Sequence, residues 1–159
     1  MAITHLHIAN EVGIAGENAA VHLLEQKGYR ILERNWKLQN LEIDIIASNK
    51  EDIVFTEVKS RTSTIILLPE EAVNKEKERN IAAAAGAYIK LHHVDKYPRF
   101  DIIGVLCQYK NNDTGDKVLE VTEIHHLEDA FHPPMRTTYS SNWNGQSKWR
   151  KKTHRRSGF

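Results

Sequence analysis

The sequence predicts an α/β protein with one central sheet that is covered by helices on both faces. Helical and strand-like patterns follow one another in the order α-β-β-β-α-β-β. The two central strands carry apolar residues on both of their faces, which indicates a sheet buried from both sides. With 159 residues, the chain has the length of one full domain and is too short for a second.

The elements follow in order along the chain. From Asn10 to Lys27, small and apolar residues recur at helical spacing, with Asn10 as the expected N-cap and Gly28 as the expected stop. A helix rich in Glu, Lys and Ala is expected from Glu70 to about Leu91. The remaining expected elements are strands at 29–36, 42–48, 53–59, 99–109 and 118–124, and a helical turn at 125–131.

The alternation of side chains predicts which residues share a face of the two central strands. The expected grouping is Ile43, Ile45, Val54 and Val58 on one face, and Ile46, Ile53 and Phe55 on the other.

Two carboxylates and a lysine lie inside these otherwise apolar strands. Asp44 interrupts the first strand, and Glu57 and Lys59 interrupt the second. Isolated charges are costly to bury, and strands rich in Ile and Val normally exclude them. A partner or a metal ion must therefore compensate these groups.

The polar segment 49–52 predicts that the two strands form an antiparallel hairpin. If Ser48 faces Ile53, the register places Asp44 opposite Glu57 and also places Glu42 opposite Lys59. All four side chains then project from one face of the hairpin.

Opposed carboxylates repel each other unless a cation or a shared proton lies between them. A divalent metal ion between Asp44 and Glu57 is the favoured interpretation. The alternative is an exposed hairpin face, with an ion pair between Glu42 and Lys59 and a tolerated repulsion between the two acids.

The near-neutral net charge of the chain hides two regions of opposite sign. Residues 136–159 hold seven Lys or Arg and no acid, so residues 1–135 carry the other 15 basic residues against all 21 acids, a net charge of −6 against +7. We therefore expect a domain at 1–135 and a basic tail at 136–159.

The tail mixes aromatic rings with cations, a composition that neutralises phosphates and stacks on bases. Its alternative interpretation is a disordered, solubilising segment. The residues expected to bind nucleic acid are Lys148, Trp149, Arg150, Lys151 and Lys152.

The only cysteine, Cys107, lies in an apolar run, which predicts a core residue and excludes an intrachain disulfide. The sequence shows no targeting segment and no membrane span, so a cytoplasmic protein without membrane contact is expected. The doublets His92-His93 and His125-His126 lack zinc-site spacing and are expected to be surface or turn residues.

Several motifs in one order resemble the bacterial YraN family of endonuclease-like proteins, which is similar in fold to archaeal Holliday junction resolvases. The resemblance covers about residues 9–131. The motifs are Gly13-x-x-Gly16-Glu17-x-x-Ala20, Gly28-Tyr29-x-Ile31-Leu32-x-Arg34-Asn35, Glu42-Ile43-Asp44-x-Ile46-Ala47, Phe55-x-Glu57-Val58-Lys59-x-Arg61, Pro69-x-Glu71-Ala72-Val73-x-x-x-Lys77 and Arg99-Phe100-Asp101.

This resemblance implies the PD-(D/E)xK nuclease superfamily, with a restriction-endonuclease-like α-β-β-β-α-β core and a mixed central sheet. It implies that Asp44 and Glu57 bind Mg²⁺ or Mn²⁺, with the Val58 carbonyl as a third ligand. Lys59 is then expected to orient the attacking water or to stabilise charge on the phosphate. By the same resemblance, Glu17 is expected to be an additional acidic ligand of the metal ion. The alternative is that Glu17 is an ordinary solvated residue of the first helix.

Lys77 matches a family position and is expected to contact phosphate, unless it belongs to a solvated charged face. Arg61 and Arg34 are weaker phosphate-binding candidates. The expected partner is DNA, and the comparison with junction resolvases suggests a homodimer that the sequence itself does not show.

The leading hypothesis is a Mg²⁺-dependent nuclease that acts on DNA, on branched or flapped structures by analogy with the resolvases. A second hypothesis is a nucleic-acid-binding adaptor that keeps the fold without catalysis. A third is a protein-interaction domain that docks through its tail. The paired acids favour the enzyme, because a pure binder has no need of carboxylates that repel phosphate.

Overall fold

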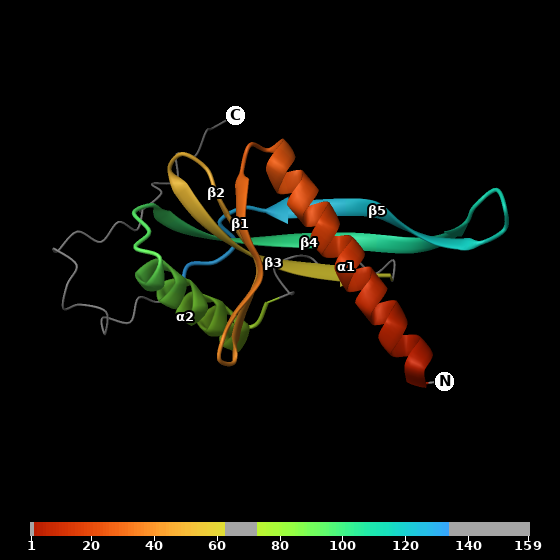
Figure 1. Cartoon of the computed structure of the whole chain (residues 1–159), viewed down its shortest axis with the longest axis horizontal. Coiled ribbons are helices and arrows are strands. Elements are labelled where there is room, and N and C mark those ends of the chain that lie inside the picture. The colour runs from red at the N-terminus through yellow and green to blue at the C-terminus, as the bar shows by residue number, and fades with distance from the viewer. Residues whose placement is uncertain (1, 63–72, 134–159) are drawn as a thin grey trace, which may run out of the picture.

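The computed structural model describes residues 2–62 and 73–133, and it confirms the predicted element order (Figure 1). The predicted tail at 136–159 lies outside the described residues, and its separation from the domain stays a prediction. The elements are α1 (Ala2–Gln26), β1 (Arg30–Leu38), β2 (Leu41–Ser48), β3 (Asp52–Arg61), α2 (Lys75–Leu91), β4 (Tyr97–Asn111) and β5 (Lys117–Leu127).

The strands form one mixed sheet in the order β1-β2-β3-β4-β5. Neighbouring strands are antiparallel except for β3 and β4, which run parallel over ten pairs from Asp52↔Tyr97 to Arg61↔Leu106. The parallel step requires a crossover, and α2 provides it. This mixed α/β arrangement is consistent with the predicted restriction-endonuclease-like fold.

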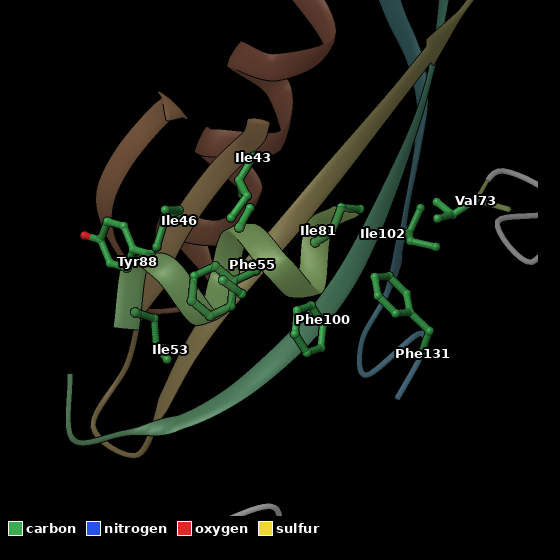
Figure 2. Close-up of a cluster of buried hydrophobic side chains, with 12 residues drawn as sticks. Ile43, Ile46, Ile53, Phe55, Val73, Ile81, Tyr88, Phe100, Ile102 and Phe131 are labelled. Carbon is green, nitrogen blue, oxygen red and sulfur yellow. The ribbon is translucent and has the colours of Figure 1, made fainter. Parts of the chain in front are cut away.

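The helices cover opposite faces of the sheet, as predicted, and α1 crosses the sheet diagonally in Figure 1. On the α1 face, the buried residues are Val12, Ala20, Leu24, Ile45, Ala47, Ile103, Val105 and Cys107. On the α2 face, shown in Figure 2, they are Ile43, Ile46, Ile53, Phe55, Val73, Ile81, Ala84, Ala85, Tyr88, Phe100, Ile102 and Phe131. Two separate apolar clusters therefore hold the sheet.

The predicted faces of the central strands are wrong at one position. Ile43 was expected to share a face with Ile45, but Ile43 packs in the α2 cluster and Ile45 packs in the α1 cluster. Residues two apart in a regular strand share a face. β2 therefore departs from regular geometry at the residue between them, Asp44.

The predicted start of the first helix is also wrong. The helix begins at Ala2, and Asn10 lies inside it rather than capping it. Ile8 packs against the same cluster as Val12, one turn further along, so the helix gains apolar contact by continuing past the expected cap.

The predicted end of this helix is confirmed. Gly28 has a φ of +85° and donates its N–H to the Glu25 carbonyl, while the next N–H, of Tyr29, reaches the Leu24 carbonyl. This pair of bonds is a Schellman motif, which requires a left-handed residue at the position of the glycine.

The second helix begins later than the predicted Glu70. Residues 63–72 lie outside the described residues, and Asn74 is the N-cap, with its side chain accepting the N–H of Lys77 at 2.8 Å. The cap satisfies a backbone donor that the first turn leaves free.

The helical turn predicted at 125–131 does not form. β5 continues to Leu127, whose partner on β4 is Ile102, and the N–H of Ala130 then reaches the Phe100 carbonyl. The pairing of β5 with β4 therefore replaces the short helix expected there. Cys107 is fully buried as predicted, and no helix in residues 2–62 or 73–133 is long and apolar enough to cross a membrane.

Candidate metal and nuclease site

The site forms where β2 separates from β3. The predicted register is confirmed from Ser48↔Ile53 to Ile45↔Thr56, and the recorded pairing ends there. Beyond this point β2 turns away together with β1, while β3 continues beside β4 (Figure 1). The two strands therefore open into a fork at the residues predicted to carry the chemistry.

Asp44 closes the fork with its side chain. Its Oδ2 accepts a hydrogen bond of 2.7 Å from the backbone N–H of Val58 on β3. In an extended strand, the N–H and C=O of one residue face the same neighbour, so the Val58 carbonyl also faces β2. The fork thus gathers a carboxylate and a backbone oxygen, two hard donors of the kind that Mg²⁺ prefers.

Glu57 is buried in the sheet next to this fork, with 3% of its surface exposed. Its Oε1 lies 2.6 Å from Lys59 Nζ and 3.2 Å from Lys77 Nζ of α2. Its Oε2 is buried and has no hydrogen-bond partner among the described residues. The exposed hairpin face, the alternative derived from the sequence, does not fit a carboxylate buried in this way.

The electrostatic environment holds the Asp44 carboxyl in a more neutral state than usual. Burial raises the pKa of Asp44 to about 6, helped by the negative charges of Glu57 and Glu17 and opposed by the Val58 N–H and the Lys77 ammonium. Removing negative charge from water without a full set of partners costs free energy, which a bound cation would recover.

The predicted pairing of Glu42 with Lys59 is wrong. Glu42 lies 3.3 Å from Lys37, its partner on β1, while Lys59 pairs with Glu57. Because β2 and β3 diverge, Glu42 moves away with the β1–β2 hairpin. The four charged residues therefore do not share one hairpin face.

Glu17 lies on α1, and its negative charge acts on Asp44 without a recorded contact between them. Its Oε2 accepts a hydrogen bond of 2.9 Å from the Asn35 amide and lies 3.7 Å from Arg34. Arg34 also donates to Asn18 at 2.8 Å, so this phosphate-binding candidate is engaged with the helix. Arg61 is exposed near the end of β3 and bonds only the Ser60 carbonyl among its recorded contacts.

The residues present fit a magnesium site built from few protein ligands. Within residues 2–62 and 73–133, no three histidine, cysteine or carboxylate side chains lie close enough together to hold a metal ion. The structure therefore does not join Glu17, Asp44 and Glu57 into one compact cluster. Mg²⁺ is commonly held by one or two carboxylates plus waters and substrate oxygens, and the unpartnered Glu57 Oε2 beside Asp44 suits that mode.

The contact between Gly16 and Ser60 sets how closely α1 approaches β3. A Cβ added at Gly16 would lie 2.8 Å from the Ser60 Cβ, so a side chain there cannot be accommodated without movement. Because Glu17 is the next residue, this contact also constrains where Glu17 lies.

We expect Gly16→Ala to lower the free energy of unfolding by about 1–3 kcal/mol, because the added methyl group overpacks this contact. Gly13→Ala is the matched control: it lies in the same helix, and no atom of the described residues comes within 4 Å of its new Cβ. It should stabilise the protein by about 0.5–1 kcal/mol through helix propensity alone. Urea unfolding measures both variants, and adding Ser60→Gly should restore Gly16→Ala. Equal stability of the two alanine variants would refute the contact.

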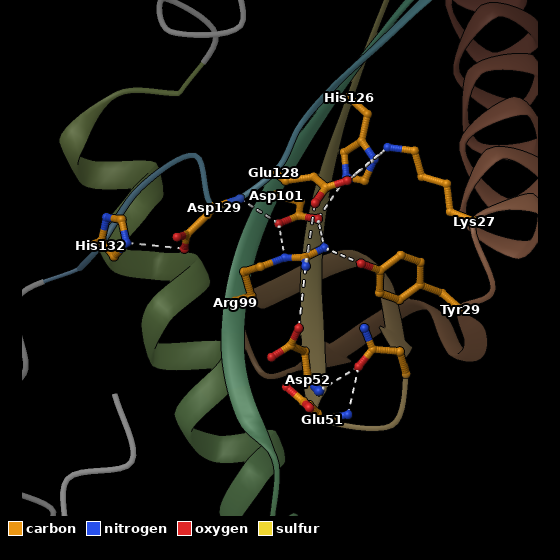
Figure 3. A network of polar contacts seen from close by, with 11 residues as sticks. Lys27, Tyr29, Glu51, Asp52, Arg99, Asp101, His126, Glu128, Asp129 and His132 are labelled. Atoms are coloured by element: carbon orange, nitrogen blue, oxygen red, sulfur yellow. Dashed lines mark hydrogen bonds and ion pairs between the residues drawn. The ribbon is translucent and has the colours of Figure 1, made fainter. Parts of the chain in front are cut away.

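A second polar centre was not predicted as a unit. Asp101 on β4 is fully buried and accepts two hydrogen bonds from Arg99, of 2.8 and 2.7 Å, and one of 3.0 Å from the Asp129 N–H (Figure 3). Arg99 also donates to the Tyr29 hydroxyl at 2.9 Å and lies over that ring. This centre ties the α1–β1 junction to β4.

His126 joins the same centre, which corrects its prediction as a surface or turn residue. Its side chain is 3% exposed, with Nε2 2.8 Å from Asp101 and Nδ1 2.9 Å from the Lys27 ammonium. An ammonium group only donates, so Nδ1 accepts and Nε2 carries the proton that bonds Asp101. His92, His93 and His125 are exposed as predicted.

The only sequence signal for this centre was the motif Arg99-Phe100-Asp101. His126 and Lys27 come from distant parts of the chain, and no spacing rule connects them to Asp101. Asp101 pairs with Thr56 in the sheet, next to the residue at which the fork begins. No recorded hydrogen bond or ion pair among the described residues joins the centre to Asp44, Glu57 or Lys59, and its bonds hold strands and helix together.

Comparisons with known proteins place the chain among relatives that share most of its length. The model of the uncharacterised protein family UPF0102 matches residues 16–105. A UPF0102 protein of Bacteroides thetaiotaomicron is 43% identical over 126 residues, which cover 79% of this chain and 96% of the relative. A UPF0102 protein of Caldanaerobacter subterraneus subsp. tengcongensis is 44% identical over 121 residues, 76% of this chain and 93% of the relative.

Proposed function

The chain belongs to the uncharacterised protein family UPF0102, and we propose that it is a metal-dependent endonuclease of the PD-(D/E)xK type, which hydrolyses phosphodiester bonds of DNA. The buried Glu57 supports the proposal most strongly, because it shares the fork with Asp44, has Lys59 and Lys77 on one oxygen and, among the described residues, has no hydrogen-bond partner on the other. A buried acid without a complete set of partners is costly, which is a common property of functional sites.

Asp44, Glu57 and the Val58 carbonyl would hold Mg²⁺ or Mn²⁺, with Glu17 as an outer acidic group. When bound, such an ion polarises the phosphate and lowers the pKa of an attacking water. Glu57 would offer its Oε2 to the ion while its Oε1 stays on the two lysines. Asp44 is held in place by the Val58 N–H, so its free oxygen keeps a fixed direction.

Lys59 and Lys77 provide the positive charge for the substrate. Both ammonium groups meet at Glu57 Oε1, so they approach the fork from β3 and from α2. A phosphate at the fork would lie between two cations, which stabilise negative charge that develops as water attacks phosphorus. Arg61 lies further along β3 and would contact a neighbouring phosphate.

DNA is the proposed substrate, with branched or flapped forms as the preferred shapes and a homodimer as the assembly on a two-fold symmetric junction. The basic tail would add affinity that depends on salt. Its residues, Lys148 to Lys152, lie outside the described part of the chain. A protein that binds such DNA and leaves it uncut would instead be the non-catalytic adaptor.

A cleavage assay tests the proposal directly. Full-length protein is incubated with single-stranded, duplex, flap and four-way-junction DNA in the presence of Mg²⁺ or Mn²⁺. We expect cleavage of at least one form by the wild type and a loss of at least about 10²-fold with Glu57→Gln, because electrostatic groups of this kind supply that much rate.

Glu42→Gln is the matched control for this assay. It removes the same charge from a neighbouring strand, but Glu42 is exposed and paired with Lys37 rather than with the fork. Its rate should equal that of the wild type. No cleavage of any DNA form by the wild type, or equal loss in both variants, would contradict the proposal.

A further inference from the structure

Asn35 lies at a break that β1 and β2 share. Its φ is +49°, in the left-handed region that side chains other than glycine rarely adopt. The pairing of the two strands continues without a shift on both sides of it, with Arg34↔Ile45 and Trp36↔Ile43. The register therefore places Asn35 across from Asp44, with no recorded pairing between them.

The faces of both strands change at this break. On one side of it, Trp36 and Ile43 pack in the α2 cluster, and on the other side Ile45 packs in the α1 cluster. A strand with regular alternation would keep Ile43 and Ile45 on one face. The left-handed turn at Asn35 and the irregularity at Asp44 therefore belong to one feature, which directs the Asp44 carboxylate toward β3.

The Asn35 side chain also orients Glu17. Its Nδ2 donates a hydrogen bond of 2.9 Å to Glu17 Oε2 on α1. Asparagine is one of the few residues with a side chain that tolerates the left-handed region and also carries an amide donor. One residue thus combines the backbone break opposite Asp44 with the hydrogen bond that orients Glu17.

We propose that Asn35 is a positioning residue, whose amide sets the placement of the Glu17 carboxylate for the metal ion of the proposed function. The inference rests on that function. Hydrogen bonds to the carboxylates of a metal site fix their orientation, and their loss weakens metal affinity. Asn35 itself would not contact the ion or the DNA.

The test uses the full chain with Asn35→Gly, because glycine keeps the left-handed backbone and removes only the amide. Gln39→Gly is the matched control. It also replaces an exposed amide residue of positive φ, +55°, in the same hairpin, but it lies in the β1–β2 turn and has no recorded contact with Glu17. Calorimetric titration with Mg²⁺ and with Mn²⁺ measures affinity, and the ¹³C carboxyl signal of Glu17 reports its hydrogen bond without metal.

We expect Asn35→Gly to weaken binding by about tenfold or more, as the loss of such an outer hydrogen bond does in metal sites, and to shift the Glu17 signal. Gln39→Gly should match the wild type in both readouts. If the wild type binds and Asn35→Gly binds equally tightly, the inference fails while the proposed function stands. If the wild type binds neither ion, the proposed function fails, and the metal role of Asn35 fails with it.

Discussion

Replacing Asp101 with alanine should lower the free energy of unfolding by about 3–5 kcal/mol, the cost typical of breaking a buried charged pair. The substitution removes the acceptor that the Arg99 guanidinium and the His126 N–H share. Arg99 then keeps only the Tyr29 side chain and its longer ion pairs with Asp52 and Glu128 among its recorded contacts. Urea unfolding at neutral pH measures the loss. If the alanine variant does not fold, Asp101→Asn keeps the shape and one acceptor and should show a smaller loss in the same direction.

Glu128→Ala is the control for this prediction. Glu128 contacts the same centre through Lys27 and, at 3.8 Å, through Arg99 and His126, but its side chain is 45% exposed. Exposed pairs contribute at most about 1 kcal/mol. A loss below about 1 kcal/mol for Asp101→Ala as well would show that the centre does not stabilise the fold as described.

The contribution of Asp101 also depends on pH. Burial opposes its ionisation, but hydrogen bonds from His126 and Arg99 outweigh burial and lower the pKa of Asp101 below its usual 3.8. A lowered pKa means that the folded state binds its proton less tightly than the unfolded state. The stabilisation is therefore complete above pH 3.8 and is lost as the pH falls below it. The difference between wild type and Asp101→Ala should shrink in acid.

The second large effect is a gain in stability. Above pH 6, the free energy of unfolding of Asp44→Asn should exceed that of the wild type by up to about 3 kcal/mol. This amount corresponds to the rise of about two units in the pKa of Asp44 on folding. The Asn oxygen can still accept the Val58 N–H, so the variant removes the charge and keeps the bond. Urea unfolding at pH 7.5 and at pH 3.5 measures the difference.

The sign follows from the raised pKa of Asp44, about 6 in the folded state against 3.8 unfolded. Between these values the folded state holds more protons, so the wild type loses stability as the pH rises and carries the full cost above pH 6. Below about pH 3.8 the two proteins should be equally stable. A wild type as stable as Asp44→Asn at pH 7.5 would contradict a strained acid at this position.

Asp113→Asn provides the control, because it makes the same chemical change in the exposed turn before β5. It should alter stability by no more than about 0.5 kcal/mol at either pH. A stabilising effect confined to Asp44 would identify the fork as a place where the chain keeps a charge at the expense of stability, as functional sites do.

The sequence was sufficient for the architecture because periodicity and turn chemistry are local. The polar segment 49–52 gave the correct register, with Ser48 facing Ile53, and Gly28 gave the correct helix end. Apolar residues on both faces of the central strands were enough to predict helices on both sides.

The details of the site depended on contacts that no local pattern contains. If the β2–β3 register had continued past Ile45, Glu42 would lie opposite Lys59. Instead, the pairing of β2 with β3 ends at Ile45, next to the break in β1 and β2 at Asn35, and local rules do not predict this break. The hydrogen bond between His126 and Asp101 could not be predicted for the same reason, because 25 residues separate the two in the sequence. Both errors arise from tertiary contacts that override strand and turn propensities.

In the function proposed above, Asp44 and Glu57 form a divalent-cation site at the fork. Calorimetric titration of the full chain with Mg²⁺, repeated with Mn²⁺, tests it most directly, with Asp44→Asn and Glu57→Gln beside the wild type. We expect saturable binding by the wild type and at least about tenfold weaker binding by each variant, a loss of at least about 1.4 kcal/mol. No binding by the wild type, or equal binding by all three proteins, would contradict it.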